Sequence, residues 1–395
     1  MGENKDTVLL SCDKTVQYSN NCVIIDENEI QDLKGKTPED YAREKMREYY
    51  IRFFSSHFEN LVLLTGAGSS VGIGKEGKKG KNRKELWKSV QDSVTVKILK
   101  KLCKNIKYDY PDNQDGDIEL ILSKAEKAKE YKTGIAKIID KIKDQIKVDC
   151  SLELPESSPH EILLQKITSR KLRDPRVKIF TLNYDTLFEQ AAEKGGFTVL
   201  DGFSYANPRS FNGMYFDYDF VIRENSRIEN EENYVPRVIH IYKLHGSLDW
   251  EKDGSEIIKS NSAYIKDPLI IYPNYDKYES SYKQPYFEMM LRFQQVLRKD
   301  NTVLLVVGFS FYDKHITSII MEALKTNPSF RMVVVVKSLA DIRDYEELKN
   351  NISKGKLMLI SESYEDFVRF YPFPQTYQSD FLKESVKDII VEKNE

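Results

Sequence analysis

Short, mostly apolar runs alternate along this chain with longer segments in which apolar residues recur every three or four positions. Runs of this length are typical of buried strands, and the periodic segments are typical of amphipathic helices. Strands buried on both faces occur mainly in parallel sheets that carry helices on each side. The pattern therefore predicts an α/β fold with a Rossmann-like parallel sheet flanked by helices. The runs that predict strands are residues 61–64, 177–182, 238–244, 302–307 and 331–336, with a further short run at 357–360.

The periodic segments divide the chain into a main domain with additions. The predicted parts are an N-terminal extension and helix (1–57), the main domain (58–372) with an inserted helical subdomain (about 84–150), and a C-terminal tail helix (373–395). The first helix is predicted to start at Thr37-Pro38, because threonine caps a helix well and proline fits its first turn. Two tyrosine-rich stretches, 197–235 and 250–285, are predicted to be irregular loops.

Four of the predicted strands end in glycine or in polar residues. The four endings are Gly66-Ala67-Gly68-Ser69-Ser70, Thr181-Leu182-Asn183-Tyr184-Asp185, His245-Gly246 and Gly308-Phe309-Ser310. The carboxyl ends of parallel strands share one edge of a sheet, where ligands bind, so these groups can form a single site. Gly66 and Gly68 would let backbone N–H groups approach a ligand, and a helix starting beyond them would favour an anion. The endings together predict a nucleotide site.

Two common nucleotide motifs are disfavoured by spacing. The dinucleotide fingerprint G-x-G-x-x-G is missed, because the third glycine, Gly72, comes one residue late. A phosphate-binding G-x-x-x-x-G-K nearly starts at Gly72, but Lys79 stands where a serine or threonine would hold magnesium. Residues 71–81 are therefore predicted to be a solvated basic loop, and the site is neither that of a dehydrogenase nor that of an NTPase.

Composition narrows the class of protein further. The chain has 395 residues, a formal net charge of −2 and 31% charged residues, so direct nucleic-acid binding is not expected. No apolar run is long enough to span a membrane, and the N-terminus lacks a signal core, so a cytoplasmic protein is expected. The four cysteines contain no C-x-x-C pair, so neither a zinc site nor a disulfide framework is expected. The many lysines of the helical segment are predicted to be solvated.

In their types and order, the four strand endings resemble the motifs of the sirtuin superfamily, which are G-A-G-x-S, T-Q-N-x-D, H-G and G-T-S. The forms T-L-N-Y-D and K-L-H-G-S-L, which begin at Thr181 and Lys243, are more similar to bacterial NAD-hydrolysing domains of antiphage defence than to deacylases. The chain departs from deacylases by lacking their paired zinc cysteines and their P-D-F-R segment. The resemblance covers roughly residues 58–340.

The resemblance implies a reaction and a role for each residue of the motifs. It implies hydrolysis of NAD at the nicotinamide–ribose bond, with Asn183 placing water or the ribose hydroxyls and His245 as general base. Histidine suits that role because its ordinary pKa lies near about 6.5. Asp185 is implied to contact the nicotinamide amide. The residues implied to hold the phosphates and the adenosine side are Gly66, Ala67, Gly68, Ser69, Gly308 and Ser310.

Other interpretations stay open. Taken singly, Asn183 could be only a strand-end turn residue, and His245 a capping or packing histidine. The whole chain could be a non-catalytic nucleotide sensor or assembly subunit, or it could transfer ADP-ribose to protein or remove acyl groups. The additions outside the core predict a homo-oligomer or a gating partner. By resemblance, that partner would be a HerA-type ATPase.

Overall fold

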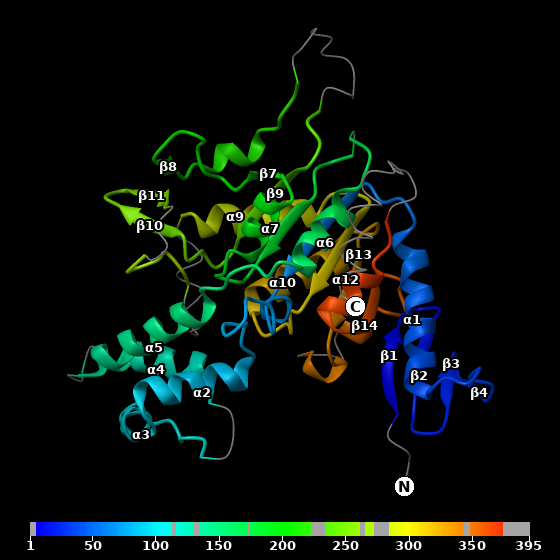
Figure 1. Cartoon of the computed structure of the whole chain (residues 1–395), viewed down its shortest axis with the longest axis horizontal. Helices are drawn as coiled ribbons and strands as arrows, with labels where there is room; N and C mark the ends of the chain where they lie inside the picture. Colours follow the sequence, from blue (N-terminus) through cyan, green and yellow to red (C-terminus); the bar gives the residue numbers. More distant parts are fainter. Residues whose placement is uncertain are drawn as a thin grey trace.

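The chain folds around a large, mostly parallel β-sheet that helices cover on both faces (Figure 1). This computed structural model describes residues 5–112, 116–129, 131, 134–172, 174–222, 234–260, 265–271, 284–342 and 348–373. The predicted α/β fold class, with a flanked parallel sheet and an inserted helical subdomain, is confirmed. The predicted tail helix, 373–395, lies outside the described residues apart from its first position.

Seven parallel strands form the middle of the sheet. In spatial order they are β14 (Leu357–Ser361), β13 (Arg331–Val336), β12 (Thr302–Val307), β5 (Asn60–Thr65), β6 (Lys178–Thr181), β9 (Val238–Lys243) and β7 (Thr198–Leu200). The chain runs from β5 to β6 on one side and later returns to β12 on the other. The strand order therefore reverses between β5 and β12, which is where open α/β sheets bind ligands.

The predicted N-terminal extension continues the sheet beyond β14. Its four strands are β1 (Asp6–Leu10), β2 (Thr15–Tyr18), β3 (Val23–Ile25) and β4 (Asn28–Ile30). β1 pairs antiparallel with β14, placing Leu9 opposite Ile360, and β2 to β4 follow as an antiparallel meander. The strands of residues 6–30 are thus built into the sheet, and the domain boundaries drawn from the sequence stay predictions.

Alternate residues of the parallel strands face two separate layers of helices. Leu63, Ile179 and Leu305 belong to one core, under α1, α6, α7 and α12, whereas Leu64, Phe180 and Leu304 belong to the other, under α9 and α10. Side chains alternate between the two faces because a strand is pleated, and here both faces of the sheet are buried. The helices are α1 (Pro38–Phe54), α6 (Pro159–Thr168), α7 (Leu187–Lys194), α9 (Tyr286–Leu297), α10 (Lys314–Thr326) and α12 (Tyr364–Phe370).

The helical insertion forms an arm with a core of its own, at the lower left of Figure 1. Its helices are α2 (Arg83–Val94), α3 (Val96–Asn105), α4 (Ile118–Lys129) and α5 (Ile135–Cys150). Asn82 starts α2 with a capping box: its side chain accepts from the N–H of Glu85, whose carboxylate accepts from the N–H of Asn82. Tyr184, which follows Asn183, packs into the core of the arm. The arm is therefore anchored beside a predicted catalytic residue.

The two tyrosine-rich stretches hold more regular structure than the sequence predicted. Their described parts include β7 and a small second sheet with the strand order β10, β11, β8. Short 3-10 turns occur in the first stretch and in other parts of the chain. The elements are β8 (Arg209–Ser210), β10 (Trp250–Asp253) and β11 (Glu256–Lys259), with the turns η1 (Ala67–Ser69), η2 (Gly213–Asp217) and η4 (Leu339–Asp341). Pairing between residues 209–210 and 258–259 joins segments far apart in sequence, so local composition did not reveal it.

Two buried histidines predict that the fold is sensitive to acid. Burial lowers the pKa of His160 and of His240 to about 3. A histidine in the unfolded chain titrates near about 6.5, so below that pH the unfolded chain binds protons that the folded chain excludes. Each histidine then contributes stability that is complete above about pH 6.5 and falls by roughly 1 kcal/mol per pH unit as the pH drops toward 3.

The acid sensitivity is tested by urea unfolding at a series of pH values between about 7.5 and 5. His160 is fully buried, and its imidazole ring packs edge-on against the rings of Phe188 and Tyr364. In the variant His160→Gln, the free energy of unfolding is expected to depend less steeply on pH, by the slope that corresponds to about one bound proton. Equal slopes for the two proteins would show that His160 does not cause the acid sensitivity.

Candidate functional site

The four predicted strand endings lie side by side at the carboxyl edge of the sheet. Thr65 pairs with Thr181 on β6, Thr181 pairs with Lys243 on β9, and Val307 on β12 pairs with Thr65. The backbone ladder continues one residue further, since Leu182 N donates to Thr65 O at 3.0 Å. The four endings are therefore level with one another at the switch point between β5 and β12. Neighbouring strands lie about 4.8 Å apart.

The Asn183 side chain ties the end of β6 to the glycine turn after β5. Its Nδ2 lies 3.0 Å from Gly66 O, 3.1 Å from Ser69 Oγ and 2.9 Å from Ser70 Oγ, and it donates toward all three. Its backbone N–H donates to Thr181 Oγ1 at 3.1 Å. The amide plane is thus fixed by several partners, and no described residue donates to its carbonyl oxygen. An oriented, half-buried amide oxygen can hold a water molecule or a hydroxyl group in one direction.

His245 lies directly beyond β9 and faces a carboxylate. Its Nε2 is 3.1 Å from Asp313 Oδ2, and the two side chains are only 11% and 6% exposed. The other oxygen of Asp313 accepts from the N–H groups of His315 and Ile316, at 3.0 and 3.3 Å, and so caps α10. A carboxylate held in this way fixes the ring and the position of its proton. The pair has the make-up of a general base with a positioning carboxylate.

The glycines of the turn have a packing reason that the sequence did not reveal. A Cβ on Gly68 would lie 2.6 Å from the Cα of Gly308, and a Cβ on Gly66 would lie 2.7 Å from the carbonyl oxygen of Gly308. The N–H groups of Gly66 and Gly68 donate to Val307 O and Gly308 O, at 3.0 and 2.9 Å. The backbone of the glycine turn therefore touches the backbone at Gly308. Among the described residues, no carbonyl accepts from the N–H of Ala67.

Asp185 and Lys243 hold together the ends of the neighbouring strands β6 and β9. Asp185 accepts from Ser70 Oγ at 2.8 Å and from Leu187 N at 3.2 Å, which fixes the start of α7. Lys243 is 1% exposed; its Nζ donates to the backbone oxygen of Asp185 and lies 3.4 Å from Glu189 Oε1. Burial raises the pKa of Glu189, and Lys243 opposes that rise. Lys243 therefore connects β9 to the segment that carries Asn183.

Removing the Lys243 amine is expected to destabilise the protein strongly. Lys243→Met would leave the Glu189 carboxylate and the Asp185 carbonyl without their buried partner, a loss of roughly 3–5 kcal/mol in the free energy of unfolding. Urea unfolding measures the loss. The exposed Lys252→Met serves as a control and should change stability by less than about 0.5 kcal/mol. The double variant Lys243→Met/Glu189→Leu should recover part of the loss, whereas a single variant as stable as the parent would contradict the bracing role.

Some residues at these strand ends were predicted from the sequence, and others were not. Gly308 and Ser310 lie at the end of β12 as predicted, with Gly308 in the left-handed region at φ +63°. Asp313 and Ser70 were not predicted as site residues. Asp313 has a local signal, since an aspartate at a helix start is a typical cap, but its contact with His245 joins residues 68 positions apart and leaves no mark in the sequence.

The described part of the chain contains neither a cluster of metal ligands nor a disulfide. Within it, no group of three or more histidine, cysteine or acidic side chains is arranged to hold a metal ion. The four cysteines are unpaired there, at Cys12, Cys22, Cys103 and Cys150. None of the helices described is long and apolar enough to cross a membrane.

Comparison with known families supports the motif resemblance. Residues 177–354 match the family model described as a SIR2-like domain. The matched stretch includes Asn183, Asp185, His245, Ser310 and Asp313 and ends before β14; it begins after the glycine turn. No curated protein matches the chain.

Two solved structures of a Sir2 homologue are also similar to the chain. Both are described as mutant complexes with ADP-ribose, one with a phenylalanine-to-alanine and one with a histidine-to-asparagine substitution. Each is 13% identical and aligns over 86% of this chain and 98% of its own, with TM-scores of 0.39 and 0.37. At these values neither structure assigns a role to a residue of this chain.

Proposed function

We propose that the protein hydrolyses NAD⁺ at the nicotinamide–ribose bond, releasing nicotinamide and ADP-ribose. The observation that carries the proposal is the level placement of Asn183 and His245, each two residues beyond the paired ends of the neighbouring strands β6 and β9. Both residues lie inside the stretch that matches a SIR2-like domain. An oriented amide and a carboxylate-paired histidine at a topological switch point suit a reaction that needs a held water molecule and a proton acceptor.

The proposed reaction forms one bond and breaks one. A water oxygen bonds to the anomeric carbon of the ribose as the bond to the nicotinamide nitrogen breaks, and the bonding electrons leave with that nitrogen. Such glycoside cleavage passes through an oxocarbenium-like state. The amide of Asn183 would orient the water or the ribose hydroxyls, and His245 would take the proton of the attacking water. Asp313 would hold His245 in place and stabilise its protonated form.

The remaining predicted residues are proposed to bind the substrate. Gly66, Ala67, Gly68 and Ser69 would form the phosphate side of the site, where Ala67 and Gly68 are exposed. Because the N–H groups of Gly66 and Gly68 already donate within the fold, Ala67 N–H is the donor best placed for a phosphate oxygen. Asp185 is proposed to meet the nicotinamide amide, and Gly308 with Ser310 the adenosine ribose.

Incubation with NAD⁺ tests the reaction. Purified protein is mixed with NAD⁺ labelled in the adenosine part, and the products are separated by chromatography, with His245→Ala as the control. Free nicotinamide in equal amount to linear ADP-ribose supports hydrolysis. Label on the protein would instead indicate ADP-ribose transfer, and intact NAD⁺ under all conditions, including an added partner, would leave a non-catalytic sensor as the better description.

On the resemblance of the motifs we also propose a biological setting. The protein would act in the bacterial cytoplasm as an antiphage effector that depletes NAD when triggered, as a homo-oligomer gated by a HerA-type ATPase. The support is the similarity of the forms at Thr181–Asp185 and Lys243–Leu248 to defence-associated domains. Cellular NAD measured during phage infection, with and without the ATPase, tests this setting. Unchanged NAD in infected cells that contain both proteins would contradict it.

A further inference from the structure

The helix α3 presents a row of lysines on the side of the arm that faces solvent. Residues 93–108, which contain α3, hold five lysines and neither aspartate nor glutamate. Three of the lysines, Lys97, Lys101 and Lys104, are exposed and follow one another after four and three positions, so they form one stripe along the helix. The opposite side of α3, which includes Leu99, is buried in the core of the arm. This lysine stripe therefore points away from the core, and Figure 1 shows α3 at the lower left end of the arm, away from the large sheet.

Among the described residues, the lysine stripe has no counter-charge. None of its three amines is in an ion pair there, whereas the neighbouring Lys100 pairs with Asp112 at 2.5 Å. Like charges three or four residues apart on a helix repel one another and destabilise it. The expectation against nucleic-acid binding was based on the formal net charge of −2, which averages over the whole chain and does not reveal this local excess. A row of uncompensated positive charges favours a partner that carries a row of negative charges.

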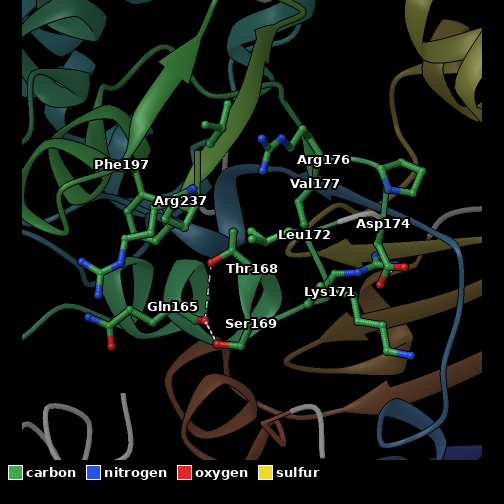
Figure 2. Close-up of a pocket in the computed structure, with 14 residues that line it drawn as sticks. Gln165, Thr168, Ser169, Lys171, Leu172, Asp174, Arg176, Val177, Phe197 and Arg237 are labelled. Carbon is green, nitrogen blue, oxygen red and sulfur yellow. Dashed lines mark hydrogen bonds and ion pairs between the residues drawn. The ribbon is translucent and has the colours of Figure 1, made fainter. Parts of the chain in front are cut away.

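Cations also line the cavity shown in Figure 2, but there the arginines are held within the fold. Each of the three has a partner from the chain itself: Arg170 pairs with Asp174, Arg176 pairs with Asp219, and Arg237 donates to Gly195 O. Their charge and hydrogen bonds are therefore used to join segments of the chain. The lysine stripe differs from this cavity because its amines are exposed on the surface of a helix.

We propose that the lysine stripe binds the phosphate backbone of duplex DNA without reading its sequence. The stripe spans about 10 Å along the helix axis, and a DNA duplex carries several phosphate charges over that length. Amines on flexible side chains contact such phosphates as point charges and need no fixed geometry. Contacts of this kind position a protein on a duplex and carry no sequence information. The arm would therefore hold the protein on DNA of any sequence.

The chemistry of α3 favours duplex DNA over other polyanions. Single strands are held largely by aromatic side chains that stack on bases, and RNA duplexes partly by contacts to 2′-hydroxyl groups, but α3 contains no aromatic, serine or threonine residue. An anionic membrane takes up helices whose apolar side is open to it, whereas the apolar side of α3 is packed in the core of the arm. An acidic protein surface is the remaining alternative, and the binding experiment separates it from DNA.

Fluorescence anisotropy of a labelled DNA duplex of about 20 base pairs, mixed with the full chain, tests the proposal. At about 50 mM salt we expect a dissociation constant of roughly 1–10 μM for duplexes of unrelated sequence, and the logarithm of the affinity should fall with that of the salt concentration with a slope of about −3. No change of anisotropy with up to about 100 μM protein would overturn the proposal. Tighter binding of polyglutamate or of phosphatidylserine vesicles than of the duplex would also overturn it, in favour of an acidic protein or a membrane.

Variants of the lysine stripe locate the contact on the chain. The triple variant Lys97→Gln/Lys101→Gln/Lys104→Gln should bind the duplex at least about tenfold more weakly, with a salt slope close to zero, because each lost phosphate contact removes about one unit of slope. Glutamine forms helices well and relieves the repulsion between the lysines, so the unfolding temperature should not fall. Arginine at the same three positions keeps the charge and should preserve binding.

A matched control separates the stripe from the overall charge of the protein. Lys252→Gln/Lys325→Gln/Lys349→Gln removes the same charge from exposed positions outside the arm, and its affinity for the duplex should equal that of the parent protein. Equal weakening in both triple variants would show an effect of overall charge alone, and full binding by the stripe variant would place DNA elsewhere on the chain. Either result would overturn the proposal. Because the measurement is DNA binding without NAD⁺, its outcome does not depend on the proposed NAD⁺ cleavage.

Discussion

Replacing Asn183 with alanine is expected to lower the rate of nicotinamide release by at least about a hundredfold. The amide is the group proposed to orient the attacking water, and its Nδ2 is held by Gly66 O, Ser69 Oγ and Ser70 Oγ. Alanine removes both the oriented oxygen and those bonds, so water could still enter but would no longer be held at the anomeric carbon. Nicotinamide release at saturating NAD⁺, measured by chromatography, gives the rate.

A control must separate the lost chemistry from the lost hydrogen bonds. Ser70→Ala removes one acceptor of the Asn183 amide and the donor to Asp185 but keeps the amide itself. It should slow the reaction by no more than about tenfold, because the other two acceptors still fix the amide plane. Thermal unfolding of both variants shows whether the fold is retained. A well-folded Asn183→Ala protein that releases nicotinamide at the full rate would rule out the assigned role.

The sheet could be predicted from the sequence because its strands carry a simple pattern. Residues 302–307 and 331–336 are apolar on both faces, which only a central strand between two layers of helices requires, and the structure places them there. The helical insertion was equally readable from its three- and four-residue spacing. The second sheet was not readable, since β8 has only two residues and depends on a partner about 50 positions away.

The candidate site was predictable in its residues but not in its contacts. Asn183, His245 and Gly308 stand out because polar residues and glycine interrupt apolar strands, and parallel topology brings such ends together. Gly68 has a packing reason that the sequence does not reveal, because its Cβ would lie 2.6 Å from the Cα of Gly308, 240 positions away. Lys243 shows the same limit of sequence reasoning. A lysine within a strand does not indicate that its amine will be buried against the Asp185 carbonyl and the Glu189 carboxylate.

The arm formed by α2 to α5 adds a connection that motif spacing cannot express. Tyr184 lies between the two polar residues Asn183 and Asp185, yet its ring belongs to the core of the arm, and its hydroxyl donates to Ile271 O at 2.5 Å. Ile271 N in turn donates to His245 O at 2.8 Å. The chain of contacts therefore links the arm to both proposed catalytic residues.

Replacing His245 with alanine is expected to reduce NAD⁺ cleavage by about 10²- to 10⁴-fold, the usual contribution of a positioned general base. The more informative change is at its partner. Asp313→Asn keeps an oxygen that caps α10, since asparagine caps helices about as well as aspartate, but it removes the charge that faces His245 Nε2. The fold should therefore be retained while the rate falls by about tenfold to a hundredfold, because the protonated ring loses its counter-charge.

The pH dependence of the rate distinguishes this role from a purely structural one. A carboxylate beside a histidine favours the protonated ring, so its removal should move the ascending limb of the pH–rate profile toward lower pH. Asp313→Ala, which loses the cap as well, should in addition lower the unfolding temperature, whereas Asp313→Asn should not. If Asp313→Asn slowed the reaction without moving the profile, Asp313 would only hold α10 in place. If neither His245→Ala nor Asp313→Asn altered the rate, the base would have to be sought among other residues of the strand ends.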